Sequence, residues 1–148
     1  MRVLLQRVTR ASVSIEGDVM SSIGIGYVLL VGFGRGDEAS QVDRLADKIV
    51  GLRIFRDADG KTNLSIADVN GEALVVSQFT LYADTRKGRR PSFVYAADPA
   101  EAAELVEAFA EALEARGLKV GRGVFGAEME VELVNDGPFT MWLDAESS

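Results

Sequence analysis

The sequence has 148 residues, a net charge of −7, and neither cysteine nor histidine. The missing cysteines exclude disulfides, thiolate catalysis and cysteine-bound metals, and the missing histidines exclude Ser-His-Asp catalysis, Cys-His catalysis and histidine-bound zinc. The length fits a single domain, 1–148, and a 47% share of hydrophobic residues is enough to build a core. Any catalysis must therefore use carboxylates, hydroxyls, amides, Lys or Arg side chains, backbone dipoles or the substrate itself.

The hydropathy pattern predicts a cytoplasmic protein. The longest apolar runs, such as Tyr27–Phe33, are far shorter than the ~20 residues of a membrane helix. The apolar part of residues 1–7 is too short for a signal peptide. We therefore expect neither a membrane span nor export.

The first half of the chain has the patterns of a β-rich fold. We expect its first strands over residues 2–8, 12–16 and 19–23. Gly17-Asp18 is predicted to be a two-residue hairpin turn, and the apolar run Tyr27–Phe33 is typical of a strand buried on both faces. A helix follows, with Asp37 as its N-cap and apolar residues three or four positions apart over Val42–Leu52.

The second half contains the best-marked helix. Asp98 is its expected N-cap, Pro99 its first residue, Glu101 completes a capping box, and Gly117 ends it. The remaining strands are expected over residues 53–56, 73–81, 118–120, 129–134 and 139–143. This order predicts a mixed α/β (α+β) fold, in which two main helices pack on largely antiparallel β-sheets.

A polar pair interrupts the predicted strand Ala73–Leu81. Strand alternation places Ser77 and Phe79 on one face, and Gln78 and Thr80 on the other. Polar side chains on a buried strand are unfavourable unless they are hydrogen-bonded or line a site. Exposure of that face to solvent is an equally simple explanation of the pattern.

The segment Asn135–Pro138 joins two predicted strands. Its composition is that of an ordinary turn. The alternative is a rigid functional backbone, because proline restricts the chain and glycine allows a ligand to approach it closely.

Two further patterns carry no site prediction. Gly32, Gly34 and Gly36 do not fit the spacing of a dinucleotide-binding fingerprint. Asp57 and Asp59 begin like a calcium loop, but the closing glutamate is absent, so we predict a plain turn. The residues alone therefore indicate a soluble domain, with an oligomer as its expected state.

Two segments in this order and at this spacing resemble the D-aminoacyl-tRNA deacylase family. They are Ser77–Leu81 and Asn135–Thr140. Further similar segments extend the resemblance over essentially the whole chain: Val3–Val8, Leu52–Phe55, Asn63–Ser65 and Gly123–Met129. The resemblance implies the three-layer fold of that family and a hydrolase that releases D-amino acids, and glycine mischarged on tRNA-Ala, from tRNA without metal or cofactor.

The resemblance also implies a homodimer with active sites at the subunit interface. In the family, a cis Gly-Pro bond reaches into the partner's pocket and excludes L-amino acids, which implies this role for Gly137 and Pro138. Arg7 resembles the arginine that helps to hold this motif. The departures are Phe139 in place of a usual valine, Thr62 in place of a common methionine, and an unusual Arg122.

The remaining site residues implied by the resemblance surround the ester: Ser77, Gln78, Thr80 and the backbone N–H groups around Phe79. Thr80 could be a nucleophile, or the pocket could position the ester while the ribose 2′-hydroxyl assists attack by water. The sequence favours the second mechanism, because a threonine nucleophile needs a base and the chain has no histidine.

Net charge disfavours nonspecific binding to nucleic acid, which depends on neutralising phosphates. One basic loop is the exception and is the candidate contact with the acceptor end of tRNA: Arg86, Lys87, Arg89 and Arg90. Three other functions remain open: a binding module for the acceptor end, a hydrolase of another ester or amide that uses Thr80, and an oligomeric structural protein.

Overall fold

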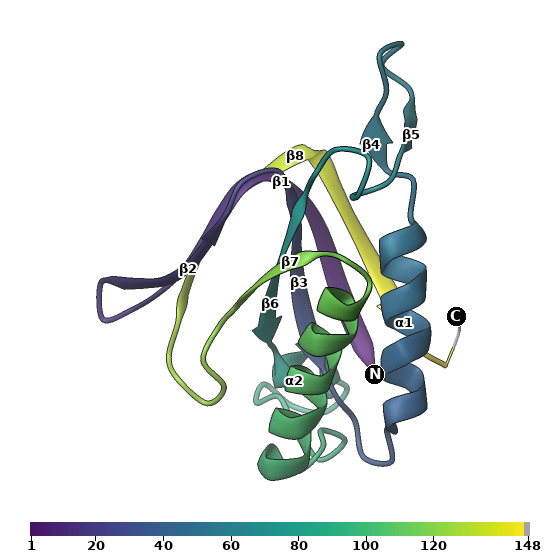
Figure 1. Ribbon diagram of the computed structural model, residues 1–148. Helices are drawn as coiled ribbons and strands as arrows, with labels where there is room; N and C mark the ends of the chain where they lie inside the picture. Colours follow the sequence, from purple (N-terminus) through teal and green to yellow (C-terminus); the bar gives the residue numbers. More distant parts are fainter. Residues whose placement is uncertain (147–148) are drawn as a thin grey trace.

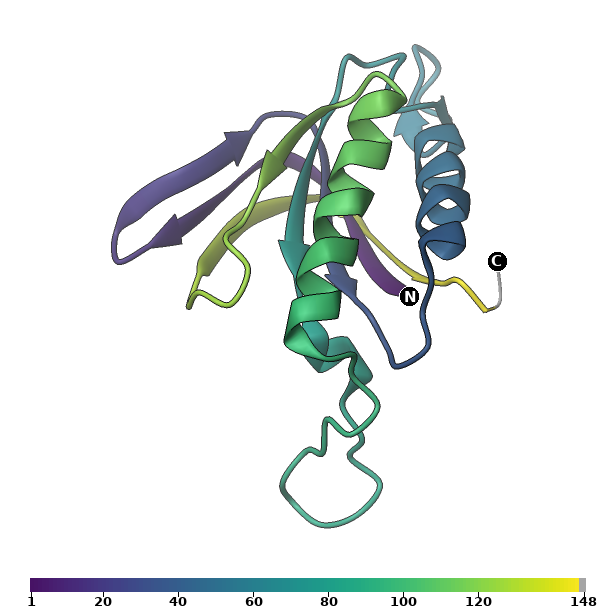
Figure 2. The same ribbon diagram turned by 60° about the horizontal axis from the view of Figure 1, so that its bottom comes forward.

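Two helices cover one face of a curved β-sheet in the computed structural model, which describes residues 1–146 (Figures 1 and 2). The elements in chain order are β1 (Arg2–Ile15), β2 (Asp18–Ile23), β3 (Gly26–Gly32), α1 (Ala39–Gly51), β4 (Phe55–Arg56), β5 (Thr62–Leu64), β6 (Glu72–Ser77), the 3-10 turn η1 (Phe79–Tyr82), α2 (Pro99–Ala115), β7 (Lys119–Arg122) and β8 (Glu130–Asp144). No helix in residues 1–146 has the length and apolar character needed to cross a membrane.

The long strand β1 organises the sheet. Its first half pairs antiparallel with β3, its second half pairs antiparallel with β2, and β8 runs antiparallel along its other edge. The sheet continues from β3 to β6 and β7 through parallel pairs. The short strands β4 and β5 form a separate antiparallel pair.

The central strands are buried on both faces, which explains their nearly continuous apolar sequences. Tyr27, Leu29 and Val31 of β3 face a core shared with the helices. Val28 faces a second core, on the side where the sheet curves over itself. In β6, the whole run Ala73–Val76 is buried.

Each helix contributes one apolar stripe to the core. The stripe of α1 consists of Val42, Leu45, Ala46 and Ile49. The stripe of α2 consists of Ala102, Phe109, Ala110 and Leu113. Arg116 joins the two helices at their surface, because its guanidinium pairs with Asp47 at 2.6 Å and with Asp43 at 3.3 Å. The predicted mixed fold with two helices is confirmed.

Both predicted helix caps differ in detail. The N-cap of α1 is Glu38 rather than the predicted Asp37, and the backbone N–H of Glu38 donates to the Gln41 side chain at 2.7 Å. The Asp37 carboxylate instead accepts hydrogen bonds from Gly34 and Tyr82. Asp98 is the N-cap of α2 and Pro99 follows it, as predicted. The Asp98 side chain makes no capping hydrogen bond, so the predicted capping box with Glu101 is wrong.

The first hairpin turn lies one residue earlier than predicted. Ile15 pairs with Asp18, so the turn residues are Glu16 and Gly17 rather than Gly17 and Asp18. Their φ values of 50° and 87° are both positive, as a type I′ turn requires. Strands β1 and β8 are also continuous where two strands each were predicted, because they pair with each other along most of their length.

Gly26 is a steric requirement of the sheet. A Cβ atom at this position would lie 1.7 Å from the backbone oxygen of Glu72, and the residue has a φ of 156°. Strand β6 pairs with β3 at this point. A side chain on Gly26 would therefore force the two strands apart.

We expect Gly26→Ala to lower the free energy of unfolding by more than about 4 kcal/mol, because backbone atoms must move. Urea denaturation monitored by circular dichroism measures the change. Gly24→Ala is the matched control, because no atom lies within 4 Å of a Cβ at that position. Equal midpoints for the two variants would contradict the expected clash.

Candidate active site

A hollow of about 550 Å³ opens where β6 ends. Three of the predicted site residues line it: Ser77, Gln78 and Phe79. The start of α2 and the segment 125–131 form its other walls. The volume is typical of a pocket for a small ligand. Among the described lining residues, Glu128 is the only one with a titratable side chain.

The polypeptide changes direction at this pocket, so the predicted strand Ala73–Leu81 is too long. The N–H of Gln78 makes the last bond to β3, donating to the carbonyl of Val31 at 2.7 Å. The chain then closes into η1, in which the N–H of Leu81 donates to the carbonyl of Gln78 at 3.2 Å. The predicted strand alternation of Gln78 and Thr80 is therefore wrong.

The 3-10 turn creates the local geometry of the site. The Gln78 side-chain amide donates to the hydroxyl of Thr80. Thr80 itself is exposed and lies outside the lining of the pocket. The backbone N–H groups of Phe79 and Thr80 have no acceptor within the turn, because they precede its first hydrogen-bonded residue. They are available to a bound oxygen atom.

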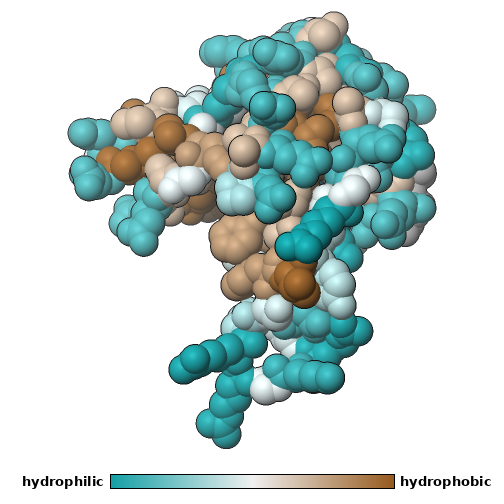
Figure 3. Space-filling model, turned by 90° about the horizontal axis from the view of Figure 1, so that it is seen from below, coloured by the Kyte–Doolittle hydropathy of each residue, from teal (hydrophilic) through white to brown (hydrophobic). Residues whose placement is uncertain are grey.

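The mouth of the pocket is aromatic. The Phe79 side chain is 54% exposed and meets Phe93 edge to face, with 4.9 Å between the ring centroids. Phe125, on the opposite wall, is also exposed. Figure 3 shows an apolar area of the surface beside a projecting hydrophilic loop. Such a surface can receive a flat, partly apolar group.

Gly137 and Pro138 lie in a bulge of β8, not in a turn between two strands. Gln6 pairs with Thr140 and Val8 pairs with Asn135, so residues 136–139 lie opposite Arg7 alone. The Gly137–Pro138 peptide bond is cis, and both residues are exposed. The surplus residues therefore leave the ladder and present their backbone to the surroundings.

Arg7 holds this bulge from inside the protein. Its side chain is 2% exposed, and Nε lies 3.2 Å from both the carbonyl oxygen and the carboxylate of Asp136. The guanidinium also donates to the carbonyl of Ile54 and lies 4.8 Å from the centre of the Phe139 ring. A buried guanidinium with this many acceptors fixes the backbone on either side of it.

The bulge and the pocket lie in different parts of the same chain. Arg7 pairs with Tyr27 and Tyr27 with Ala73, while Ser77 comes four residues later in β6. Three strand spacings from β8 to β6 span about 14 Å and four residues about 13 Å. Neither Gly137 nor Pro138 lines the pocket. The predicted site residues therefore form two groups.

The basic loop projects from the end of the molecule below α2 (Figure 2). Its base is closed by an antiparallel bridge between Asp84 and Ser92. Arg86 is held there by both carboxylate oxygens of Asp84, at 2.8 and 2.7 Å, and by the hydroxyl of Tyr95 at 3.2 Å. The bonds from Arg86 lower the pKa of Asp84 to about 2.

The other three basic residues of the loop are exposed: Lys87, Arg89 and Arg90. The loop therefore has two parts: a lower part that is fixed by the bonds of Arg86, and an exposed cationic tip. Phe93, which follows the loop directly in sequence, contacts Phe79 at the pocket.

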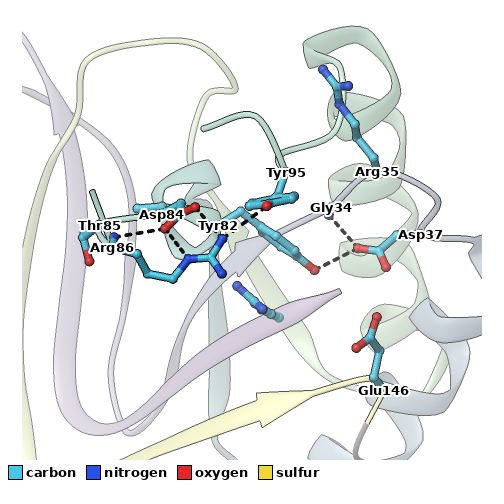
Figure 4. Close-up of a pocket in the computed structure, with 11 residues that line it drawn as sticks. Gly34, Arg35, Asp37, Tyr82, Asp84, Thr85, Arg86, Tyr95 and Glu146 are labelled. Carbon is cyan, nitrogen blue, oxygen red and sulfur yellow. Dashed lines mark hydrogen bonds and ion pairs between the residues drawn. The ribbon is translucent and has the colours of Figure 1, made fainter. Parts of the chain in front are cut away.

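A second, polar hollow of about 480 Å³ lies on the other side of η1 (Figure 4). Within it, one oxygen of Asp37 accepts from the Gly34 N–H at 2.6 Å and from the Tyr82 hydroxyl at 3.1 Å. The same oxygen lies 2.5 Å from the ammonium group of Met1. Burial opposes ionisation of Asp37, but these bonds and this cation together lower its pKa.

Two solved structures share the fold of this chain. One similar solved structure, titled "c-Myc DNA Unwinding Element Binding Protein", has a TM-score of 0.91 and 39% identity, and covers 97% of this chain and 98% of that chain. A second, titled as a "probable eukaryotic D-amino acid tRNA deacylase", has a TM-score of 0.82 and 18% identity over 96% of this chain and 97% of that chain, and shows the same fold.

Sequence comparison then gives the family. The family model described as D-Tyr-tRNA(Tyr) deacylase matches residues 4–144. D-aminoacyl-tRNA deacylase of Thermomicrobium roseum is 61% identical over 98% of this chain and 94% of the relative. That of Chloroflexus aurantiacus is 59% identical over 98% and 91%. The chain belongs to the D-aminoacyl-tRNA deacylase family, a family of hydrolases, which confirms the resemblance.

Part of the pocket lining could not be predicted from the sequence pattern. Phe125, Glu128 and Met129 line it, together with Ala97 and Ala102 near the start of α2. The segment Gly123–Met129 was recognised only as part of the resemblance. Glu128 carried no site prediction, because it comes before β8 and strand alternation alone cannot show that the chain turns there.

Proposed function

We propose that this protein hydrolyses the ester bond of D-aminoacyl-tRNA and releases the D-amino acid and tRNA in the cytoplasm. The observation that carries the proposal is the pocket beside Ser77, Gln78 and Phe79, on a chain of this family. Glycine, including glycine mischarged on tRNA-Ala, is also a substrate, because it has no side chain to be excluded.

Positioning and electrostatics supply the catalysis in this proposal. The ester carbonyl points at the unpaired backbone N–H of Phe79, which stabilises the developing oxyanion. One such donor can contribute roughly 3–4 kcal/mol at the upper end. The ribose 2′-hydroxyl assists attack by water, and Ser77 and Gln78 orient the ester. No metal or cofactor takes part.

Thr80 is a structural or binding residue rather than the nucleophile in this scheme. A nucleophilic hydroxyl needs an adjacent base to take its proton. The partner of the Thr80 hydroxyl is the amide of Gln78, which donates a hydrogen bond and cannot act as that base. The exposed position of Thr80 outside the pocket lining points the same way.

A homodimer completes the site by bringing the bulge of one chain to the pocket of its partner. The separation of Gly137 and Pro138 from the pocket supports this arrangement, as does the exposed backbone that they present. The sheet face turned away from the helices also offers apolar area for association, including Trp142, which is 49% exposed. An isologous contact would create two composite sites.

Chiral selection follows from excluding the wrong isomer. The backbone carbonyls at Gly137 and Pro138 stand where the α-carbon of the amino acid binds. An L-side chain collides with this backbone, while a D-side chain points away from it. Arg7 holds this stretch of backbone in place, because it binds the backbone and the side chain of Asp136. A rigid clash is an efficient way to reject a mirror image.

The cationic loop contacts the acceptor end of the tRNA. Lys87, Arg89 and Arg90 bind phosphates, and Arg86 contributes positive charge at the base. The exposure of the tip supports this placement, as does Phe93, which follows the loop in sequence and contacts Phe79 at the pocket.

Release of amino acid from D-Tyr-tRNA and L-Tyr-tRNA, with EDTA present, tests the proposed activity. We expect turnover of the D-ester alone. Equal turnover of both esters would contradict the proposed exclusion of L-amino acids by the backbone at Gly137 and Pro138. No turnover with tRNA still bound would favour a binding module. Thr80→Val should cost less than about tenfold in kcat, whereas losing a true nucleophile costs on the order of 10⁶.

Mixing two inactive variants tests the composite site. Gly137→Val should block the partner's pocket, and Phe79→Pro should disable its own, because proline has no backbone N–H to donate to the oxyanion. After subunit exchange, about a quarter of the sites should combine an intact pocket with an intact bulge and recover activity. Each variant incubated alone is the control. No recovery, with exchange verified by native mass spectrometry, would contradict a cross-subunit site.

Replacing Lys87, Arg89 and Arg90 together with Gln tests the phosphate contact. The variant should need more tRNA for half-maximal rate, and the slope of log KM against log salt should fall by about two to three. The matched control neutralises three other exposed basic residues: Lys48, Arg56 and Lys61. An unchanged slope in the loop variant would rule out the contact.

A further inference from the structure

We propose that Gly32, Gly34, Asp37 and Tyr82 form a seat that positions the 3-10 turn η1, and that the catalytic rate depends on this seat. The proposal rests on the proposed function, because η1 carries Phe79 and Thr80. It gives a role to two glycines for which the sequence pattern offered none.

The two glycines let the turn lie directly against the end of β3. A Cβ atom on Gly32 would lie 2.8 Å from the backbone oxygen of Gln78 and 3.2 Å from the Cβ of Leu81. A Cβ atom on Gly34 would lie 2.4 Å from a ring carbon of Tyr82. Any side chain at either position must therefore displace the turn or its last residue.

The hydrogen bonds of Asp37 fasten the far end of the turn. Tyr82 is the last residue of η1, and its hydroxyl donates to Asp37 at 3.1 Å, as Figure 4 shows. Asp37 is itself fixed by the N–H of Gly34 at 2.6 Å and by the Met1 ammonium at 2.5 Å. On the other side, the Arg2 guanidinium lies 4.3 Å from the centre of the Tyr82 ring.

The seat is directly connected to the proposed oxyanion site, because it contacts both ends of the turn that carries Phe79. Gln78, whose carbonyl touches Gly32, starts the turn, and Tyr82 ends it. Between them lies the backbone N–H of Phe79, which we assign to the oxyanion. A displacement of about 1 Å in such a group can cost on the order of 100-fold in rate. Asp37 and Tyr82 are therefore positioning residues that do not touch the substrate.

Two variants test the seat. Tyr82→Phe removes only the bond to Asp37, and we expect kcat for D-Tyr-tRNA to fall by about 3–10-fold with KM unchanged, because the turn shifts slightly. Gly32→Ala pushes on the backbone of Gln78 and should lower kcat by on the order of 100-fold. A purely structural role would change thermal stability without changing kcat in the folded protein.

Matched controls separate the seat from general effects. Tyr27→Phe also removes a tyrosine hydroxyl, in this case a buried one without a hydrogen-bond partner among the described residues. Gly51→Ala adds a methyl group where no atom lies within 4 Å. Both should keep the kcat of the unmodified protein. If Gly32→Ala fails to fold, Tyr82→Phe alone decides the question.

Fluorescence reports on the seat without using activity. Trp142 is the only tryptophan of the chain, and Arg2 lies within reach of both its ring and the Tyr82 ring. Gly34→Ala should displace the Tyr82 ring and with it Arg2, and so change the Trp142 emission. Gly34→Ala combined with Tyr82→Ala should emit like Tyr82→Ala alone, because the clash is gone.

The outcomes are distinct. Lower kcat and altered emission in the seat variants, with normal controls, would support the proposal. Normal kcat in folded Tyr82→Phe and Gly32→Ala would overturn it while leaving the proposed function intact. An unmodified protein that does not turn over D-Tyr-tRNA would instead refute the proposed function, and with it the catalytic role of the seat.

Discussion

The pairing of β1 with three other strands is the constraint on which the rest of the structure depends. Because both edges of β1 are occupied, β8 must follow it closely, and any surplus residue in β8 has to leave the ladder. That happens opposite Arg7, where residues 136–139 bulge outward. The same strand fixes β3, and β3 fixes the end of β6, where the pocket opens.

The long periodic elements were predictable from the sequence because their patterns record burial directly. The stripe of α1 and the run Ala73–Val76 are examples. The end of β6 was not predictable, because Ser77–Leu81 has the composition of a strand and closes into a turn only through bonds to Val31 and within itself. Tertiary contact decided the local structure there.

The candidate site was likewise predictable from the sequence only in part. The residues Ser77–Phe79 were placed at a site by resemblance, and the structure puts them in a pocket. The bulge at Gly137 could not be distinguished from a turn, because its shape depends on the register of β1 and β8. Glu128 and Phe125 were missed because a loop that folds back onto a pocket has no periodic signal.

The buried Arg7 does for this chain what a covalent cross-link does in many small proteins. It joins the segment at Ile54 to the segment at Asp136, far apart in sequence, in a protein that has no cysteine. Unlike a disulfide, the hydrogen bonds of a guanidinium are neither broken by thiols nor formed by oxidants. The shape of the bulge is thus independent of the redox state of its surroundings. The backbone at Gly137 and Pro138 stays equally exposed under oxidising and reducing conditions.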